Sequence, residues 1–201
     1  MLFVCFLEFG YWLLDCYNQI MQFTHSTKIK DIIIITPDVF GDERGFFMET
    51  YRENIFAQNG IDVKFVQENH SRSQKAVLRG MHFQKPPFSQ SKLVRCTKGV
   101  VLDVVVDCRQ NSDTFGEYEM VEISEENKKM IFIPQGFAHG FVSLTDVADF
   151  QYKCDNYYNK ESEGGIIYND PKIAIPWPKM DYIISEKDKL LGDLDTIRGI
   201  F

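Results

Sequence analysis

Short runs of apolar and β-branched residues alternate with turn-forming residues along most of the chain. Two stretches carry the pattern: DIIIITPDVFGDERGFFMETY, and KLVRCTKGVVLDVVVDCRQNSDTFGEYEMVEIS. Such runs are typical of the strands of a sandwich or barrel. VVLDVVVD is almost continuously apolar, which predicts a strand covered on both faces, whereas YEMVEI alternates as a half-exposed strand does. Lys98 and Gly99 predict a hairpin between two runs, so the middle of the chain should be antiparallel β structure.

Helical signals are few. YRENIFAQNG predicts two turns that end before Gly60, and SEKDKLL offers Ser185 as the N-cap of another short helix. Neither GxGxxG nor the GxxxxGKS/T loop occurs, so the nucleotide-binding folds that depend on them are not indicated. The predicted fold is all-β: a jelly roll, an antiparallel sandwich or barrel with a few short helices, whose two sheets enclose a pocket.

The length of 201 residues suits a single domain with one core. The opening MLFVCFLEFGYWLLDCYNQI has no Lys or Arg before its apolar part, and Glu8 and Asp15 interrupt it. It therefore fits neither a signal peptide nor a membrane span. Because Met21 is a second candidate start, we expect residues 1–20 to be a non-native or upstream-start extension and residues 21–201 to be the domain.

The charge balance argues against two kinds of partner. The chain has 29 acidic and 22 basic residues, a net charge of -7. Nucleic acids and anionic membranes call for clustered positive charge, so we expect neither, and an anionic ligand must be held by a local basic pocket. The five cysteines form no CxxC pair, which favours a reducing cytoplasm over a disulfide framework or a zinc knuckle.

The four histidines are the first candidates for chemistry. None has the HxH or HExxH spacing that brings two imidazoles to one metal, so no metal site is expected. His25 and His70 are interpreted as structural. His82 in RGMHFQ and His139 in IPQGFAHGF lie beside glycine among apolar residues, where an unpartnered polar ring is costly. These two are therefore candidate functional residues.

A series of longer motifs goes beyond these general signals. In chain order they are FGDERGFFMETY, FVQENHSRS, VLRGMHFQKPP, KLVR, DVVVDCR, TFG, IPQGFAHGF, QYKCDNYY, NDP, IPWP and SEKD. Together they resemble the dTDP-4-dehydrorhamnose 3,5-epimerase family of the cupin superfamily, from about Ile32 to Leu194. Eleven ordered motifs are far more specific than one short pattern.

The resemblance implies a homodimeric jelly roll that acts on a 4-keto-6-deoxy hexose nucleotide, without a metal or an organic cofactor. It implies that His82 is the catalytic base, Asp188 its partner and Tyr152 the catalytic acid. It also places Lys92 near the sugar O4, with His139 lining the pocket. One departure is Ser91, because family members usually carry glycine just before this lysine.

The same resemblance implies the substrate-binding residues. Arg44 and Arg79 match positions that hold the diphosphate, for which the planar guanidinium is suited. Tyr158 matches an aromatic residue that stacks on the base. Further nucleotide or sugar contacts, some of them made across the dimer, are implied for Glu49, Gln67, Asn69, Glu163 and Lys187.

Three other functions remain open at this point. An epimerase that inverts only C3 or only C5 would carry the same motifs. A metal-dependent cupin such as a dioxygenase is disfavoured by the missing HxH pair. A non-catalytic cupin that binds a nucleotide sugar would not need an acid and a base on opposite faces, whereas this chain matches both.

Overall fold

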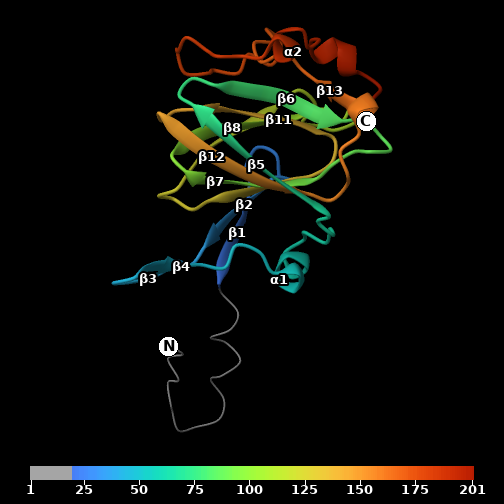
Figure 1. Cartoon of the computed structure of the whole chain (residues 1–201). Helices are drawn as coiled ribbons and strands as arrows, with labels where there is room; N and C mark the ends of the chain where they lie inside the picture. Colours follow the sequence, from blue (N-terminus) through green and yellow to red (C-terminus); the bar gives the residue numbers. More distant parts are fainter. Residues whose placement is uncertain (1–19) are drawn as a thin grey trace.

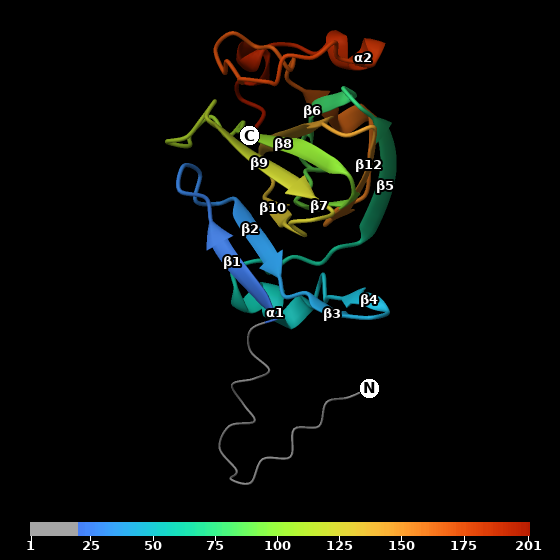
Figure 2. The ribbon, with the colours of Figure 1, turned by 90° about the vertical axis from the view of Figure 1, so that its left-hand side faces the viewer.

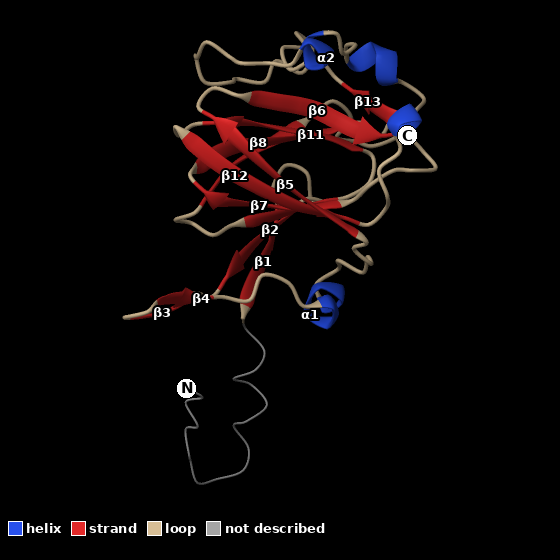
Figure 3. Ribbon diagram, in the orientation of Figure 1, coloured by secondary structure: helices blue, strands red, loops and turns tan. Residues whose placement is uncertain are grey.

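Antiparallel sheets dominate the computed structural model, which describes residues 20–201 (Figure 3). One sheet has the strand order β1-β2-β10-β7-β12-β5, a second has the order β13-β6-β11-β8-β9, and β3 pairs with β4 alone. The all-β jelly roll predicted from the sequence is confirmed. The strands are β1 (Met21–His25), β2 (Ile33–Pro37), β3 (Phe40–Asp42), β4 (Gly45–Phe47), β5 (Gln67–Gln74), β6 (Leu78–Gln84), β7 (Lys92–Lys98), β8 (Val100–Asp107), β9 (Tyr118–Ser124), β10 (Met130–Ile133), β11 (Phe137–Ser143), β12 (Val147–Cys154) and β13 (Glu163–Gly165).

The two large sheets pack face to face around a common core (Figures 1 and 2). Val94 and Phe150 of the six-stranded sheet meet Val101 and Val105 of the five-stranded sheet in this core. The opposite face of β8 packs under the segment that follows Cys154 in the chain. The sequence VVLDVVVD is therefore covered on both faces, as predicted.

Short helices lie outside the two sheets, on opposite sides of the sandwich, as Figure 1 shows. Helix α1 (Glu53–Gln58) packs Phe56 against the outer face of the six-stranded sheet. Helix α2 (Glu186–Lys189) begins after Ser185, which caps it as the sequence predicts. Two single turns of 3-10 helix complete the set, η1 (Lys160–Ser162) and η2 (Leu194–Ile197). No helix within residues 20–201 has the length and apolar character needed to span a bilayer.

The predicted hairpin at Lys98 and Gly99 is wrong. β7 pairs with β10 and β12, whereas β8 pairs with β9 and β11, so the two runs belong to different sheets. Gly99 turns the chain from one layer to the other. Its φ of +72° is a backbone conformation that residues with L side chains rarely adopt. Turn residues indicate that a strand ends, but they do not determine whether its successor pairs with it.

The extension expected at residues 1–20 lies, except for its last residue, outside the described range. The first strand, β1, begins at Met21 and pairs with β2. The domain boundary therefore stays a prediction.

Candidate active site

A cavity of about 670 Å³ opens between the two sheets. This volume is in the range of pockets that hold small organic ligands. Strands β5, β7 and β12 supply one wall, β6 and β11 supply the opposite wall, and the segment before α2 closes the rim. Eleven of the residues predicted for the site line this cavity: Gln67, Asn69, Arg79, His82, Lys92, His139, Tyr152, Tyr158, Glu163, Lys187 and Asp188.

A bulge in β6 brings Arg79 and His82 to the same wall. Residues three apart in a regular strand point to opposite faces. Here His82 pairs with His139 and Arg79 pairs with Phe141, so two residues of β6 lie opposite one of β11. The extra residue shifts the alternation by one position, and both side chains line the cavity.

Glycine is required within this bulge. Gly80 has φ +126°, and a Cβ atom there would lie 2.5 Å from Cα of Gly140 on the neighbouring strand. The N–H of Gly80 donates to Oδ2 of Asp188 at 3.3 Å. The close approach of the two strands therefore depends on the glycine in RGMHFQ.

His82 and Asp188 form a hydrogen-bonded pair. Nε2 of His82 lies 2.8 Å from Oδ1 of Asp188, and the Asp188 N–H donates to the capping Oγ of Ser185 at 3.1 Å. Burial acts to raise the pKa of Asp188, but the hydrogen bond and charge of His82, with the backbone N–H of Gly80 and the side-chain hydroxyl of Ser185, lower it below its ordinary value. An ionised carboxylate only accepts hydrogen bonds, so Nε2 carries the proton and Nδ1 of the neutral ring keeps a lone pair.

Tyr152 lies on the opposite wall from His82. It belongs to β12 in the six-stranded sheet, where it pairs with Asn69 of β5, whereas His82 belongs to the five-stranded sheet. Burial, and then Cys154, raise the pKa of Tyr152 above its ordinary value, against smaller opposing effects of Arg79 and Asn69. The hydroxyl of Tyr152 therefore holds its proton at neutral pH.

Lys92 and His139 are buried in the same cavity. Nζ of Lys92 donates to the carbonyl oxygen of His82 at 3.3 Å. Burial lowers the pKa of Lys92, while Cys154 and then Asp103 oppose this change. Burial also lowers the pKa of His139, although Nε2 of its ring lies 2.8 Å from Oδ2 of Asp103. His139 is therefore neutral at neutral pH.

Arg79 reaches the rim of the cavity. Its Nε donates to Oγ of Ser73 at 3.1 Å, and its Nη2 donates to the carbonyl of Arg72 at 3.3 Å. These bonds hold the stem of the guanidinium while Arg79 stays exposed. A positive charge is thus fixed at the entrance of the cavity.

The other side of the entrance carries Tyr158, Glu163 and Lys187. Nζ of Lys187 lies 2.5 Å from Oε2 of Glu163, and this pair is surface-accessible. The N–H of Tyr158 donates to Oε1 of Gln67 at 2.9 Å, which ties its loop to β5. Tyr158 is 52% exposed, so its ring is available to a ligand at the entrance.

Two predicted binding residues lie away from this cavity. Arg44 occupies the turn of the β3–β4 hairpin, where it pairs with Asp42. Glu49 pairs with Arg52 at 2.6 Å, just before α1. Neither lines the cavity of its own chain.

Asp103, the partner of His139, was not predicted from the sequence. This residue is fully buried in β8 and lies among apolar neighbours. A carboxylate in the middle of the apolar run VVLDVVVD was the available signal, because a buried charge needs a partner. Nδ1 of His25, expected to be structural, donates to the Lys30 carbonyl at 2.7 Å, whereas His70, given the same interpretation, lies at the cavity rim.

The donor set offers no metal centre in the part of the chain that the structure describes. Among residues 20–201, no group of three or more His, Cys, Asp or Glu side chains is placed to hold a metal ion. The histidines of the cavity are each paired with one carboxylate instead.

Comparisons with known proteins identify the family of this chain. The family model described as dTDP-4-dehydrorhamnose 3,5-epimerase matches residues 26–196. The Escherichia coli protein of that name is 53% identical over 173 residues, which cover 85% of this chain and 94% of the relative.

Two solved structures share the fold. One is a Legionella pneumophila dTDP-6-deoxy-D-glucose-3,5-epimerase in complex with dTDP-4-keto-L-rhamnose: 46% identity, TM-score 0.84, covering 87% of this chain and 93% of that chain. The other is a 3'-monoepimerase from Streptomyces bikiniensis in complex with dTDP-quinovose: 33% identity, TM-score 0.82, covering 86% and 88%. With the family match, these likenesses show that the chain is an isomerase and belongs to the dTDP-4-dehydrorhamnose 3,5-epimerase family.

Proposed function

We propose that the enzyme inverts C3 and C5 of dTDP-4-dehydro-6-deoxy-D-glucose and produces dTDP-4-dehydro-L-rhamnose. The observation that carries this proposal is the pair of proton-transfer groups on opposite walls of one cavity, His82 with Asp188 and Tyr152 facing them. The dTDP sugar bound in the Legionella relative supports the choice of substrate.

His82 acts as the base in this proposal. C3 and C5 both flank the C4 carbonyl, so removal of a proton from either carbon gives an enolate that the same carbonyl stabilises. The lone pair of Nδ1 takes the proton, while Asp188 accepts from Nε2 and stabilises the imidazolium that forms. The side chain of His82 is 38% exposed, which leaves Nδ1 accessible from the cavity.

Tyr152 acts as the acid. Inversion requires the new proton to arrive at the face opposite the one that lost it. The raised pKa of Tyr152 keeps its hydroxyl protonated at neutral pH, ready to protonate the enolate carbon from the other wall. Solvent then returns a proton to the tyrosinate and removes the one held by His82, which restores the enzyme for the second centre.

Lys92 stabilises the enolate. Negative charge develops on O4, and a fixed donor in a dry cavity lowers the barrier by about 3 kcal/mol. Lys92 is 9% exposed and is held by the His82 carbonyl, so its ammonium is placed before the reaction begins. The proposed steps need neither a metal nor an organic cofactor, because side chains and solvent perform each of them.

The entrance residues bind the nucleotide in this proposal. Arg79 contacts the diphosphate and Tyr158 stacks on the base. The remaining polar side chains of the rim contact the sugar or the nucleotide: Gln67, Asn69, His139, Glu163 and Lys187.

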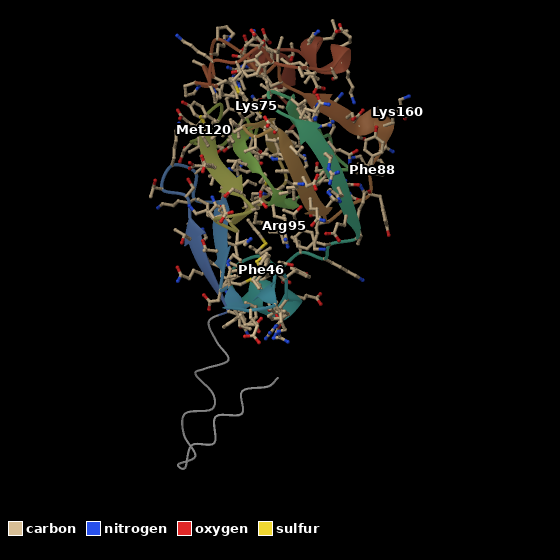
Figure 4. The ribbon with its side chains drawn as sticks, turned by 60° about the vertical axis from the view of Figure 1, so that its left-hand side comes forward. Phe46, Lys75, Phe88, Arg95, Met120 and Lys160 are labelled. Atoms are coloured by element: carbon tan, nitrogen blue, oxygen red, sulfur yellow. The ribbon has the colours of Figure 1, made fainter. Side chains whose placement is uncertain are left out.

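The enzyme is proposed to work as a homodimer. Phe40, Phe46 and Phe47 of the β3–β4 hairpin are 57%, 58% and 69% exposed. The hairpin projects from the sandwich in Figure 1. In Figure 4, Phe46 of the hairpin and Lys75, which follows β5, are labelled at opposite ends of the molecule. An isolated two-stranded hairpin with exposed aromatic residues is marginal in water. A second copy of the chain would cover it and receive Arg44 and Glu49 beside its own cavity.

Mixing two inactive variants tests this arrangement. Arg44→Ala and His82→Ala subunits, refolded together, form mixed dimers in which one site has both residues. Recovered activity is the expected result, with the separate variants as controls. Activity no greater than the sum of the two separate variants contradicts a shared site, and a monomer by light scattering contradicts the dimer.

A cytoplasmic location is also proposed. Cys96, Cys108 and Cys154 are free and buried, which agrees with a reducing compartment. Thiol counting on the protein purified from its native cell tests this expectation: a disulfide among the three would oppose it.

A second candidate is inversion at one centre only, which the likeness to the 3'-monoepimerase favours. Nuclear magnetic resonance of the substrate in deuterated water separates the two. Deuterium at both C3 and C5 of an inverted product supports the proposal. Inversion at one carbon supports the second candidate, and exchange at neither carbon contradicts both.

A further inference from the structure

Asp103 is an unusual residue for the centre of a sandwich. It is 0% exposed, and its strand neighbours Val101 and Val105 belong to the core between the sheets. Oδ2 accepts from Nε2 of His139 at 2.8 Å, whereas Oδ1 is buried without a hydrogen-bond partner among the described residues. A carboxylate oxygen left this way is costly unless a nearby positive charge compensates it.

Lys92 is linked to this carboxylate through the two histidines: its Nζ donates to the His82 carbonyl, and His82 pairs across the strands with His139, which bonds to Asp103. The groups around Lys92 are Asp103 on β8, His82 on β6, His139 on β11, and Tyr152 and Cys154 on β12. Burial favours the neutral amine of Lys92, and negative charge on Cys154 or Asp103 favours the ammonium.

Of these two groups, Cys154 is excluded as a source of negative charge, which leaves the carboxylate of Asp103. Burial raises the pKa of Cys154 to about 11, so its side chain is a neutral thiol. Tyr152 keeps its proton because its pKa is also raised. His139 is neutral, since burial lowers the pKa of its ring, and it does not neutralise the carboxylate.

We propose that Asp103 is a positioning residue for the reaction: it holds Lys92 as the ammonium ion and fixes His139 with its proton on Nε2. This inference rests on the proposed function, in which the ammonium of Lys92 meets the charge on O4. With Nε2 bound to Asp103, Nδ1 of His139 is left as a hydrogen-bond acceptor for a substrate hydroxyl. The carboxylate itself does not line the cavity and acts through its two neighbours.

The test is Asp103→Asn, which keeps the shape and removes the charge. The kcat is expected to fall about a hundredfold, the loss for one such donor, with KM within about twofold of wild type. The alkaline limb of the pH–rate profile should move to lower pH, because Lys92 loses its proton more easily. An alkaline limb at the same pH in the variant and the wild type would contradict the proposed role of Asp103.

Asp107→Asn is the matched control. Asp107 lies on the same strand and is also 0% exposed, but it pairs with Arg109 at 2.7 Å, and its other side-chain partners, Ser112 and Thr114, lie outside the cavity as Arg109 does. The two variants remove equally buried carboxylates. Only Asp103→Asn should move the alkaline limb, and an equal movement in both variants would mean that general loosening of β8 is the cause.

A measurement without turnover covers the case in which Asp103→Asn does not fold. Lysine labelled with carbon-13 at Cε reports the charge of Lys92 in the wild-type protein, and the Lys92→Arg variant assigns its resonance. The ammonium form at neutral pH is expected, together with the Nε2–H tautomer of His139 by nitrogen-15 resonance. A neutral Lys92, or the other tautomer, overturns the proposal. Failure of the wild type to turn over the sugar nucleotide would instead overturn the proposed function and leave these readings intact.

Discussion

Nε2 of His82 lies 2.8 Å from Oδ1 of Asp188, although 106 residues separate the two in the chain. The contact depends on the bulge at Gly80 and on the bridge between Val77 and Ile183, which aligns the C-terminal segment with β6. The strand, the bulge and the short helix together orient one imidazole toward the cavity.

Replacement of His82 by alanine should lower kcat at least about a hundredfold, the low end for a positioned general base. Binding of dTDP should be largely kept, because the phosphate and base contacts lie at the entrance. Steady-state kinetics and calorimetry provide the two readings. His25→Ala, an exposed histidine bonded to the Lys30 carbonyl, is the control. A His82→Ala variant with near wild-type kcat would make His82 a structural residue.

Arg79→Ala should weaken the binding of dTDP, and the loss should be larger at low salt, since an exposed charge pair is screened by ions. Calorimetry at two salt concentrations measures both effects. Arg198→Ala removes another exposed guanidinium, one that pairs with Asp195 outside the cavity. Equal affinities of the Arg79→Ala variant and the wild type for dTDP would mean that Arg79 does not bind the diphosphate.

Activity should survive exhaustive treatment with EDTA. The charge on the enolate is met by Lys92 in the proposed mechanism, and the described residues offer no cluster for a metal ion. Assays before and after chelation, with metal analysis of the treated protein, give the answer. Loss of activity that a divalent ion restores would refute the prediction.

Asp188 should make stability depend on pH. Its pKa is lowered in the folded protein, so its contribution is present above the unfolded value of about 3.9 and is lost as the pH falls through the folded value. Asp188→Asn removes a hydrogen bond to a charged group, worth about 1.5–3 kcal/mol. The variant should melt several degrees below wild type at neutral pH, at about 2–4 °C per kcal/mol.

Melting curves at neutral pH and below about pH 4 check this sign, because the gap between variant and wild type should narrow in acid. Asp62→Asn makes the same chemical change at an exposed position. A gap that is constant with pH would mean that the ionised form of Asp188 does not contribute.

The sequence predicted much of this arrangement because local patterns determine much of it. The apolar run of β8 and the serine cap of α2 are local signals, and both predictions agree with the structure. The family motifs indicated the residues of the site, and eleven of them line one cavity.

What the sequence did not predict depends on contacts between distant segments. Gly99 signalled a turn, but the pairing of β8 with β11 is determined by packing across the core. The alternation of β6 is changed by a bulge that only the partner strand reveals. The run VVLDVVVD marks Asp103 as a buried carboxylate, but only the structure shows that His139 is its partner.

The central claim is that His82 and Tyr152 exchange protons at opposite faces of the sugar, and Tyr152→Phe tests it most directly. This substitution keeps the ring in place and removes only the hydroxyl. With the variant shown to be folded, dimeric and able to bind dTDP, the substrate is followed by nuclear magnetic resonance in deuterated water. The account predicts that deuterium still enters C3 or C5 with retained configuration, while formation of the inverted product falls far more than exchange does. Equal loss of exchange and inversion, or normal rates of both, would contradict Tyr152 as the acid on the face opposite His82.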